Sequence, residues 1–363
     1  MKLIDLIAGA RPNFMKIAPI IDALEKARAN GSHLRYRLIH TGQHYDRNMS
    51  GSFFKQLGIP DPDINLEVGS GTQAEQTAGI MLGYERVLLE EKSDLCVVVG
   101  DVTSTMACAI TAQKLHVPVA HVEGGIRSGD WTMPEEINRM VTDTVTNWFF
   151  TTSEFANENL RKSGVGKDRI FFVGNTMIDT LLKHLPRLQI PPVWNNMGLR
   201  EKHYFVVTLH RPNNVDAELN LKNLLEAIIQ GARGLPIIFP VHPRTAKNLE
   251  RMGIKTDGLH LTEPLSYLEF NSLVKNAFAV ITDSGGITEE TTVLGVPCMT
   301  LRDTTERPET ITMGTNELVG TNPDNLAPHL ERLFAGKWKN GAIPPLWDGK
   351  AAERIVEHMT VLL

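Results

Sequence analysis

Two acidic side chains stand where the sequence favours proton chemistry. Glu123 follows the apolar run 117–122 and opens a Glu-Gly-Gly-Ile-Arg segment that ends at Arg127. Asp101 follows the apolar run 95–99 after a single glycine. Ligands of open α/β sheets bind outside the carboxyl ends of the strands. We therefore expect both carboxylates to lie at one ligand-binding edge, although Asp101 alone could also be a helix N-cap.

A third acid, Glu135, follows Pro134 at an expected helix start, and Arg139 lies one turn further on. Acidic residues in a first helical turn are common because of the helix dipole alone. Taken by itself, this pattern does not distinguish a catalytic acid from a structural one.

Cations gather at the first expected strand–helix turn. Arg11 and Lys16 flank the start of a helix that follows strand 2–8. A helix N-terminus already favours anions through its free N–H groups and its dipole. We interpret the turn as a phosphate or leaving-group site; the alternative is a helix start with two solvated cations.

The second half of the chain repeats this arrangement with different residues. His210 and Arg211 follow one strand, and His242 follows the next. A further strand leads into Ser284-Gly285-Gly286, whose small residues would let a pyrophosphate approach a helix N-terminus. Glu290, about one turn into that helix, could accept hydrogen bonds from a ribose.

Strands alternate with helices along the whole chain, which indicates parallel sheets covered on both faces. The expected strands are 2–8, 36–40, 95–99, 117–122, 147–152 and 169–173, then 204–209, 236–241, 258–261, 278–282 and 296–301. A proline-bearing bridge at about 180–200 separates the two series. We predict two doubly wound, Rossmann-like α/β domains facing a cleft, over 1–180 and 190–349, with the final helix 350–363 packing back on the first.

Composition narrows the classes of partner. The 363 residues carry a net charge of −5, which gives no reason to expect nucleic acid. No apolar run reaches the length of a membrane span, and the three cysteines have no metal-ligand spacing. The N-terminal apolar run is too short for a signal peptide. We expect a cytoplasmic protein without a metal site, membrane contact or nucleic-acid partner.

The chain resembles the non-hydrolysing UDP-N-acetylglucosamine 2-epimerases, and the resemblance spans nearly all of it. Ordered motifs carry it: Gly9-x-Arg11-Pro12, Thr41-Gly42-Gln43-His44, Gly100-Asp101, His121-Val122-Glu123-Gly124-Gly125-Ile126-Arg127, Pro134-Glu135-Glu136, Gly174-Asn175-Thr176, Thr208-Leu209-His210-Arg211, Asp283-Ser284-Gly285-Gly286 and Arg302-Asp303-Thr304-Thr305-Glu306-Arg307-Pro308. The family implies the two-domain glycosyltransferase-B architecture and a homodimer.

The resemblance also implies a reaction. UDP leaves C1 of the sugar as a base removes the C2 proton, and UDP and a proton then return to the resulting glycal. A C2 proton that no carbonyl activates requires either transient oxidation by NAD or a good leaving group. The sequence lacks a dinucleotide fingerprint, so we expect no cofactor. The substrate would be a UDP-2-acetamido sugar, as in the synthesis of cell-surface polysaccharide precursors.

Residue roles follow from matching positions in the family motifs. Asp101, Glu123 and Glu135 are the acid/base candidates, and Arg11, Lys16 and His210 would assist departure of the phosphate. The full set expected to bind substrate or UDP is Arg11, Lys16, Arg127, Arg139, His210, Arg211, Phe270, Ser284, Gly285, Gly286, Glu290 and Arg307, with Phe270 beside the uracil. Which carboxylate is the C2 base stays open.

An effector site for a second substrate molecule is a further implication. Gln43, His44 and His242 match its pattern, but Asp46 stands where glutamine or glutamate is expected. No arginine occurs around 68–70, where family members often carry one. The sequence therefore leaves allosteric activation by substrate open.

Alternatives remain at this point. The 41–46 and 53–54 patterns also resemble the branch that acts on 2,3-diacetamido uronic acid or 6-deoxy UDP-sugars. A hydrolysing relative would release UDP and free N-acetylmannosamine. A glycosyltransferase or a non-catalytic sugar-nucleotide sensor could share the architecture, although a sensor has no use for three acids.

Overall fold

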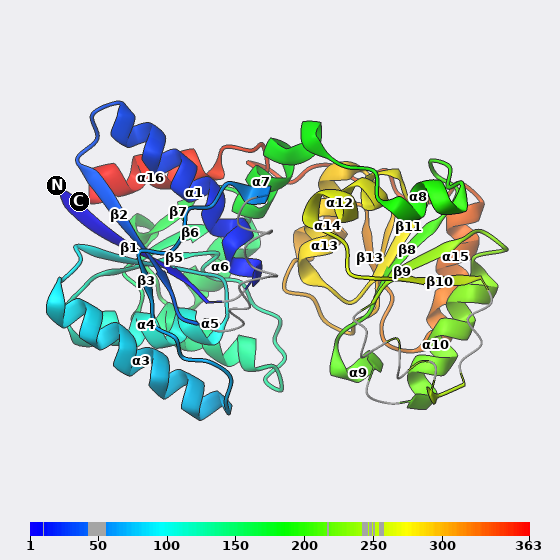
Figure 1. Cartoon of the computed structure of the whole chain (residues 1–363), viewed down its shortest axis with the longest axis horizontal. Coiled ribbons are helices and arrows are strands. Elements are labelled where there is room, and N and C mark those ends of the chain that lie inside the picture. The colour runs from blue at the N-terminus through cyan, green and yellow to red at the C-terminus, as the bar shows by residue number, and fades with distance from the viewer. Residues whose placement is uncertain are drawn as a thin grey trace. The chain divides into compact units, whose positions relative to one another are not determined.

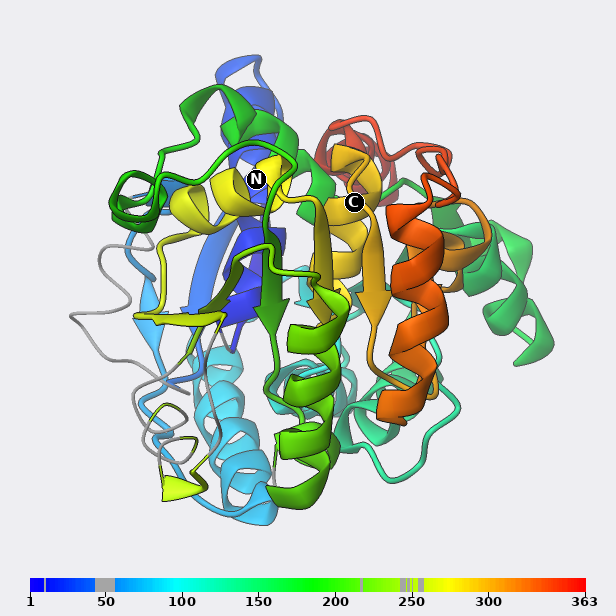
Figure 2. The same ribbon diagram turned by 90° about the vertical axis from the view of Figure 1, so that its right-hand side faces the viewer.

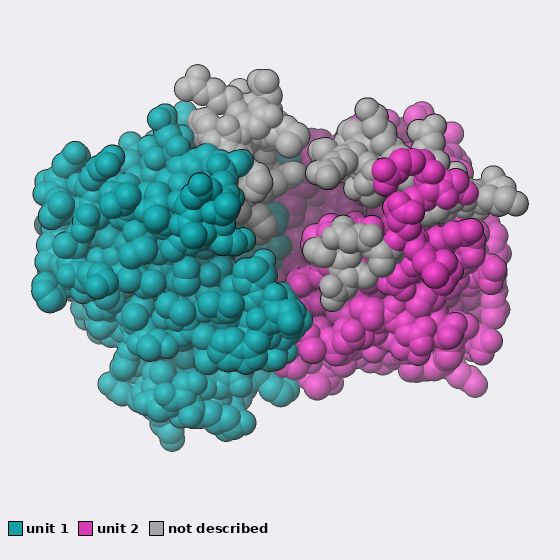
Figure 3. All heavy atoms as spheres, turned by 90° about the horizontal axis from the view of Figure 1, so that it is seen from below, with its two compact units in different colours: residues 1–183, 345–363 teal, residues 184–344 magenta. Residues whose placement is uncertain are grey.

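The computed structural model divides the chain into two compact units, Met1–Lys183 with Pro345–Leu363 and His184–Pro344 (Figure 3). The structure describes residues 1–9, 11–42, 56–215, 218–241, 246, 249, 251–253 and 258–363. Within these ranges, the side chains of 11, 12, 212 and 213 are excluded. We describe each unit separately and call them unit 1 and unit 2.

Unit 1 is built on a seven-stranded parallel sheet in the order β3-β2-β1-β4-β5-β6-β7. Its strands are β1 (Lys2–Ala8), β2 (Leu34–His40), β3 (Ile64–Asn65), β4 (Leu95–Val99), β5 (Val119–Val122), β6 (Trp148–Thr151) and β7 (Ile170–Phe172). β4 lies near the middle and is buried at all five positions, as its Leu-Cys-Val-Val-Val sequence favours.

Helices cover both faces of this sheet. They are α1 (Arg11–Ala29), α3 (Gln73–Glu90), α4 (Thr103–Lys114), α5 (Pro134–Val145), α6 (Glu154–Lys162), α7 (Thr176–His184, whose last residue opens unit 2) and α16 (Ala351–Leu362). α1 and α16 lie side by side on one face, and α3, α4 and α5 follow one another on the other (Figure 1). A capping box fixes the start of α3: Thr72 accepts a hydrogen bond from the Glu75 N–H, and Glu75 accepts one from the Thr72 N–H.

The last segment of the chain completes unit 1. Trp347 is buried and its indole N–H donates to the carbonyl oxygen of Thr152 at 2.9 Å. The carboxylate of Asp179 accepts hydrogen bonds from the N–H groups of Ala351 and Ala352, at 3.1 and 2.7 Å. These two donors belong to the first turn of α16 and have no partner within the helix. Asp179 therefore anchors the start of α16 to α7.

Unit 2 contains a six-stranded parallel sheet in the order β10-β9-β8-β11-β12-β13. The strands are β8 (Phe205–Thr208), β9 (Ile237–Pro240), β10 (Leu259–Thr262), β11 (Ala279–Thr282), β12 (Cys298–Thr300) and β13 (Asn316–Leu318). The helices are α8 (Pro192–Met197), α9 (Pro212–Val215), α10 (Glu218–Gly231), α12 (Tyr267–Asn276), α13 (Gly285–Leu294), α14 (Pro308–Thr312) and α15 (Leu326–Phe334). Short 3-10 turns occur at Lys167–Arg169, Leu185–Arg187 and Pro323–Asn325.

Two cores sandwich the sheet of unit 2. Phe205 and Val207 of β8 pack into the core beneath α10 and α15, whereas Val206 between them packs into the core beneath α12 and α8. Figure 2 shows α10 and α15 lying side by side over the sheet. Alternate side chains of a strand point to opposite faces, so a continuous apolar strand supplies both cores.

The structure confirms every strand that the sequence predicts, with ends that differ by two residues at most. It adds two short edge strands, β3 and β13, that the sequence pattern did not reveal. Helix α1 begins at Arg11, at the first edge of the segment 11–16 where the sequence predicts the helix start. Within the described residues, no helix is both long enough and apolar enough to cross a membrane.

Candidate functional site

The sheet of unit 1 changes its direction of growth between β1 and β4. The chain proceeds from β1 through β2 to β3 on one side, then crosses to β4 on the other. Such a switch point leaves an opening at the carboxyl ends of the two strands, where ligands of doubly wound folds bind. Asn13 joins the two strand ends, because its side chain accepts a hydrogen bond from the Gly9 N–H and donates one to the Val99 carbonyl oxygen.

Glu123 lies directly at this edge and pairs with Lys16. Its Oε2 is 2.7 Å from the Lys16 ammonium, and its side chain is 2 % exposed against 12 % for the lysine. The residue has a φ of +71°, which is rare for a side-chain-bearing residue and costs about 1–2 kcal/mol. Strained backbone of this kind concentrates at functional sites. The predicted acid at the tip of β5 is thus a buried carboxylate in a fixed ion pair.

Gly100 provides the room for this pair. It has a φ of +70°, and a Cβ at this position would lie 3.4 Å from Lys16 Nζ and 4.0 Å from Glu123 Oε2. The strand end of β4 therefore approaches both charged groups closely through bare backbone.

Asp101 is bound by Arg139 of α5. Its Oδ2 accepts hydrogen bonds from Arg139 Nη2 at 2.5 Å and Nε at 3.1 Å, and the Asp101 side chain is 31 % exposed. The Asn138 side chain donates to the backbone carbonyl oxygen of Asp101 at 2.9 Å. α5 thereby fixes both the backbone and the carboxylate of Asp101.

The acidic pair on α5 divides into two environments. Glu136 is buried, accepts hydrogen bonds from the Ser128 and Gly129 N–H groups, and pairs with Arg139 at 2.6 Å. Burial alone would raise the pKa of Glu136, but these hydrogen bonds and Arg139 outweigh it and lower the pKa below its usual value. Glu135 is half-buried and makes no hydrogen bond or ion pair with the part of the chain that the structure describes. Glu135 is therefore the member of the pair that a substrate could engage.

Arg127 contacts a carboxylate inside the unit. Its Nη1 lies 2.6 Å from Oδ2 of Asp143, a buried residue of α5. The same Asp143 oxygen accepts a hydrogen bond from the Gly125 N–H, and Oδ1 lies 2.7 Å from Nδ1 of His121. Asp143 thus holds the turn that follows Glu123.

In unit 2, Asp283 organises the corresponding strand ends. This fully buried carboxylate follows β11, and it accepts hydrogen bonds from the N–H groups of His210 and Arg211 and from the Asn214 side chain. It also lies 2.7 Å from Nδ1 of His210, whose side chain is 62 % exposed. Burial acts to raise the pKa of Asp283, yet His210 and the N–H donors hold it below the usual range. An exposed imidazole is thereby oriented by a buried carboxylate.

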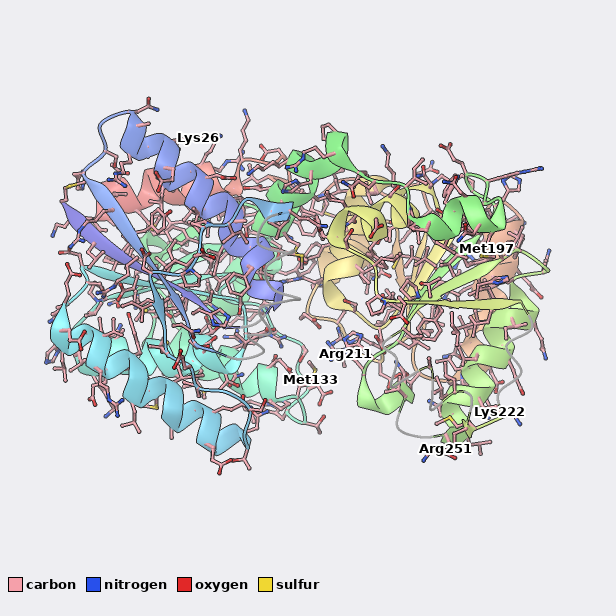
Figure 4. All side chains as sticks on the ribbon, in the orientation of Figure 1. Lys26, Met133, Met197, Arg211, Lys222 and Arg251 are labelled. Carbon is pink, nitrogen blue, oxygen red and sulfur yellow. The ribbon has the colours of Figure 1, made fainter. Side chains whose placement is uncertain are left out.

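Arg211 extends from the segment between β8 and α9 (Figure 4). Its Nε donates to the carbonyl oxygen of Asp283 at 3.0 Å, and its Nη2 lies 3.9 Å from Glu306. Glu306 in turn pairs with Arg302 at 2.7 Å. Arg211, which the sequence predicts to bind substrate or UDP, therefore lies at the end of β11, just before α13.

The expected anion site lies at the N-terminus of α13, and its role in binding stays a prediction. Ser284 occupies the N-cap position with extended backbone, and its side chain makes no capping hydrogen bond. A Cβ on Gly285 would lie 2.6 Å from Glu306 Oε1, so a side chain here would force Glu306 to move. The free N–H groups of a helix start favour an anion such as a diphosphate.

Glu290 is buried one turn into α13, where the sequence placed it. Its Oε1 accepts hydrogen bonds from the Tyr267 hydroxyl at 2.9 Å and the Asn271 amide at 3.3 Å. Burial raises the pKa of Glu290 to about 7, although both donors oppose the shift. Oε2 receives no hydrogen bond from any described residue, so it can accept from a ligand hydroxyl.

Two other predicted ligands lie nearby in the same unit. Phe270 is on α12, between the two residues that bind Glu290, and is half-buried against the adjacent core. Arg307 is buried, and its Nε pairs with Glu289 at 2.6 Å. A direct role of Arg307 in binding substrate stays a prediction.

Four predicted residues cannot be placed. The side chain of Arg11, and Gln43, His44 and His242 entirely, lie outside the described residues. The effector-site prediction is therefore untested.

The sequence did not lead us to the residues that support the site by binding its backbone. One of them, Asp143, lies two turns along α5 from Glu135, and its place on the polar face of this helix could have indicated it. Asp283 was visible as an acid after a strand but was not assigned a role. The part of Asn13 in joining two strand ends could not be read from its position.

Comparison with known proteins decides the family. The family model described as UDP-N-acetylglucosamine 2-epimerase matches residues 26–360. A relative from Methanocaldococcus jannaschii with this same description is 43 % identical, with 99 % of each chain covered. The chain belongs to the UDP-N-acetylglucosamine 2-epimerase family. Another relative, the UDP-2,3-diacetamido-2,3-dideoxy-D-glucuronate 2-epimerase of Pseudomonas aeruginosa, is 38 % identical over the full length of both proteins.

Solved structures agree with this membership. The crystal structure of the M. jannaschii UDP-GlcNAc 2-epimerase in complex with UDP-GlcNAc and UDP superposes with a TM-score of 0.87 and covers 99 % of this chain and 100 % of that one. The two doubly wound units agree with the predicted glycosyltransferase-B fold class.

Proposed function

We propose that this protein is a UDP-N-acetylglucosamine 2-epimerase that interconverts UDP-N-acetylglucosamine and UDP-N-acetylmannosamine. The observation that carries the proposal is the buried Glu123–Lys16 pair at the switch point of unit 1, next to Asp101 held by Arg139. Family membership supports it over the whole chain.

The proposed reaction is an elimination followed by an addition. A carboxylate removes the proton at C2 while the C1–oxygen bond breaks, so UDP leaves with the bonding electrons and C1=C2 forms. A UDP oxygen then adds to C1, and a proton returns to C2 on the opposite face. Inversion requires proton donors on both faces of C2, and Asp101, Glu123 and Glu135 supply them.

Cations lower the barrier to departure of the diphosphate. In our proposal Arg11, Lys16 and His210 stabilise the charge that develops on the leaving phosphate. Unit 2 holds UDP: the α13 N-terminus at Ser284 and Gly285 binds the diphosphate, and Glu290 binds the ribose. Gly286, Arg211, Phe270 and Arg307 complete the proposed binding set, and the elimination uses no redox cofactor.

The decisive experiment follows the C2 position in deuterated water by NMR. Incubation with UDP-N-acetylglucosamine is expected to yield the manno epimer with deuterium at C2. Free N-acetylmannosamine accumulating with UDP would identify a hydrolase instead, and turnover that depends on an acceptor would identify a transferase.

A matched substitution tests the assigned acid. Glu123→Gln is expected to slow C2 exchange by roughly two orders of magnitude or more while UDP affinity persists, because the amide cannot move the proton. Wild-type exchange in this variant would refute the role of Glu123. Glu91→Gln, on the surface of unit 1, is the control that should leave exchange unchanged.

The related diacetamido uronate sugar is a second candidate substrate, which the P. aeruginosa relative supports. Exchange with this sugar nucleotide but not with UDP-N-acetylglucosamine would select it. We further propose a cytoplasmic homodimer, and light scattering in solution tests the dimer.

A further inference from the structure

His121 of β5 has both ring nitrogens bound inside unit 1. Its Nε2 lies 2.7 Å from the carbonyl oxygen of Gly100, and its Nδ1 lies 2.7 Å from Asp143 Oδ1. A carbonyl oxygen only accepts, so Nε2 carries a hydrogen. His121 is fully buried, so water cannot replace either partner.

The carboxylate of Asp143 holds the other nitrogen of the ring. Its Oδ1 lies beside His121 Nδ1, and its Oδ2 accepts a hydrogen bond from the Gly125 N–H and contacts Arg127. Although burial raises the pKa of Asp143, His121 and Arg127 outweigh burial and hold that pKa below its usual value. The Gly100 carbonyl oxygen and Asp143 therefore hold the His121 ring from both sides.

The His121 side chain connects the elements that carry the proposed acids. The last backbone hydrogen bond between β4 and β5 runs from the Gly100 N–H to the Val122 carbonyl oxygen at 3.0 Å. The next carbonyl, that of Gly100, is bound by the His121 side chain instead. His121 therefore adds one more hydrogen bond between β4 and β5, at the residue just before Asp101.

On its other side, the pair holds the turn that contains Glu123. Asp143 accepts hydrogen bonds from the Gly125 N–H and contacts Arg127, so it fixes the backbone just after the strained Glu123. A Cβ at Gly124 would lie 3.4 Å from both Asp143 Oδ1 and His121 Nδ1, and 2.8 Å from the Phe149 ring. The turn therefore packs directly against the pair.

We propose that His121 and Asp143 are positioning residues, which hold Asp101 and Glu123 at a fixed separation for proton transfer on the two faces of C2. The inference rests on the proposed epimerase function. Misplacement of a catalytic group by about 1 Å can cost on the order of 100-fold in rate. An epimerase is sensitive to this distance because both acids must reach the same carbon.

The charges around His121 come from each neighbouring element. Asp143 belongs to α5, Arg127 to the loop after β5, and the Lys16–Glu123 pair joins α1 to the end of β5. His121→Gln retains a side-chain donor but lacks the ring that contacts both the Gly100 carbonyl oxygen and Asp143.

The first test is made on the wild-type protein. Nitrogen-15 NMR of the imidazole is expected to show a hydrogen on His121 Nε2, the nitrogen that faces the Gly100 carbonyl oxygen. An Nε2 without a hydrogen would overturn the bridge to Gly100. This readout does not depend on any activity, so it separates failure of this inference from failure of the proposed function.

The second test measures what positioning would change. We expect His121→Gln and Asp143→Asn to lower kcat about 10- to 100-fold with little change in KM, and to raise the fraction of C2 exchange events that end without inversion. His358→Gln is the control, because His358 packs against Phe171 in the same unit, away from this network. Unchanged kcat and unchanged partitioning in a folded His121→Gln or Asp143→Asn variant would refute the positioning role.

Discussion

At the scale of single residues, the site includes a glycine whose backbone lies close to charged groups. Gly100 has a φ of +70°, and a Cβ there would be in van der Waals contact with the Lys16 ammonium, at 3.4 Å. Its lack of a Cβ is favoured by the backbone conformation.

Gly100→Ala is expected to destabilise unit 1 by about 1–2 kcal/mol through the left-handed backbone alone. It should also lower kcat, since the new methyl group would contact the Lys16 ammonium and replace its polar surroundings with an apolar group. Urea unfolding and the C2 exchange rate measure the two effects separately.

Gly164→Ala is the matched control. Gly164 has a φ of +84°, and a Cβ there would meet no described heavy atom within 4 Å. We expect a similar loss of stability with unchanged kcat. Equal kcat losses in both variants would show that strain, not contact with the ion pair, matters at Gly100.

The raised pKa of Glu290 predicts that the stability of the protein depends on pH. Burial raises its pKa from 4.5 to about 7, so the folded protein retains a proton that the unfolded chain releases at lower pH. The contribution of Glu290 to stability is therefore full below about pH 4.5 and is lost as the pH rises through 7. Glu290→Gln removes this dependence, so its unfolding free energy relative to wild type should rise between pH 5 and pH 8.

Urea titrations of wild type and Glu290→Gln at pH 5 and pH 8 measure this difference in unfolding free energy. The contributions of all other titrating groups are the same in both proteins and cancel in the difference. A constant difference would contradict a raised pKa for Glu290. The comparison requires no ligand, so it is independent of the ribose-binding role.

At the scale of elements, the side chain of Asn13 positions the first turn of α1 against the ends of two strands. Asn13 binds the Gly9 N–H and the Val99 carbonyl oxygen, and Lys16 lies one turn further along the same helix. The register of α1 against β4 therefore sets where the Lys16 ammonium lies.

Asn13→Ala leaves a buried N–H and a buried carbonyl without these partners, at a cost of about 1–3 kcal/mol. We expect a lower urea midpoint and a reduced C2 exchange rate, because Lys16 is no longer held in place. Asn30→Ala, just beyond the end of α1, should change neither quantity. A stability loss at Asn13 without any loss of rate would separate the helix anchor from the site.

The elements themselves were largely predictable, and their connections were not. Runs such as 95–99 are apolar over a strand's length and end in glycine, which leaves little choice of structure. β3 has two residues and β13 has three, so neither is long enough to show a periodicity. Asp101 and Glu123 were predictable because they follow strands. Asp143 acts through His121, a contact between residues 22 positions apart that no local pattern encodes.

At the scale of the whole molecule, unit 1 is discontinuous in sequence and unit 2 is continuous. Residues 345–363 supply Trp347 and α16 to unit 1 after the chain has completed unit 2. Substitutions in this last segment should therefore act on the unit that begins the chain.

Trp347→Ala is expected to destabilise unit 1 by about 3–5 kcal/mol, as for other buried aromatic residues. Calorimetry should show one transition at a lower temperature, and UDP, which we assign to unit 2, should stabilise the other. Trp338→Ala is the reciprocal control, because Trp338 donates to the Thr315 carbonyl oxygen within unit 2. A single transition that shifts as a whole in both variants would contradict separate unfolding of the units.

The split of unit 1 also has a consequence for synthesis on the ribosome. Unit 2 can fold as soon as its continuous segment has emerged, whereas unit 1 waits for residues 345–363, which are translated after unit 2. At about 5–20 residues per second, translation of residues 184–344 lasts roughly 8–30 s. During this time the surface that Trp347 and α16 will cover stays open to solvent.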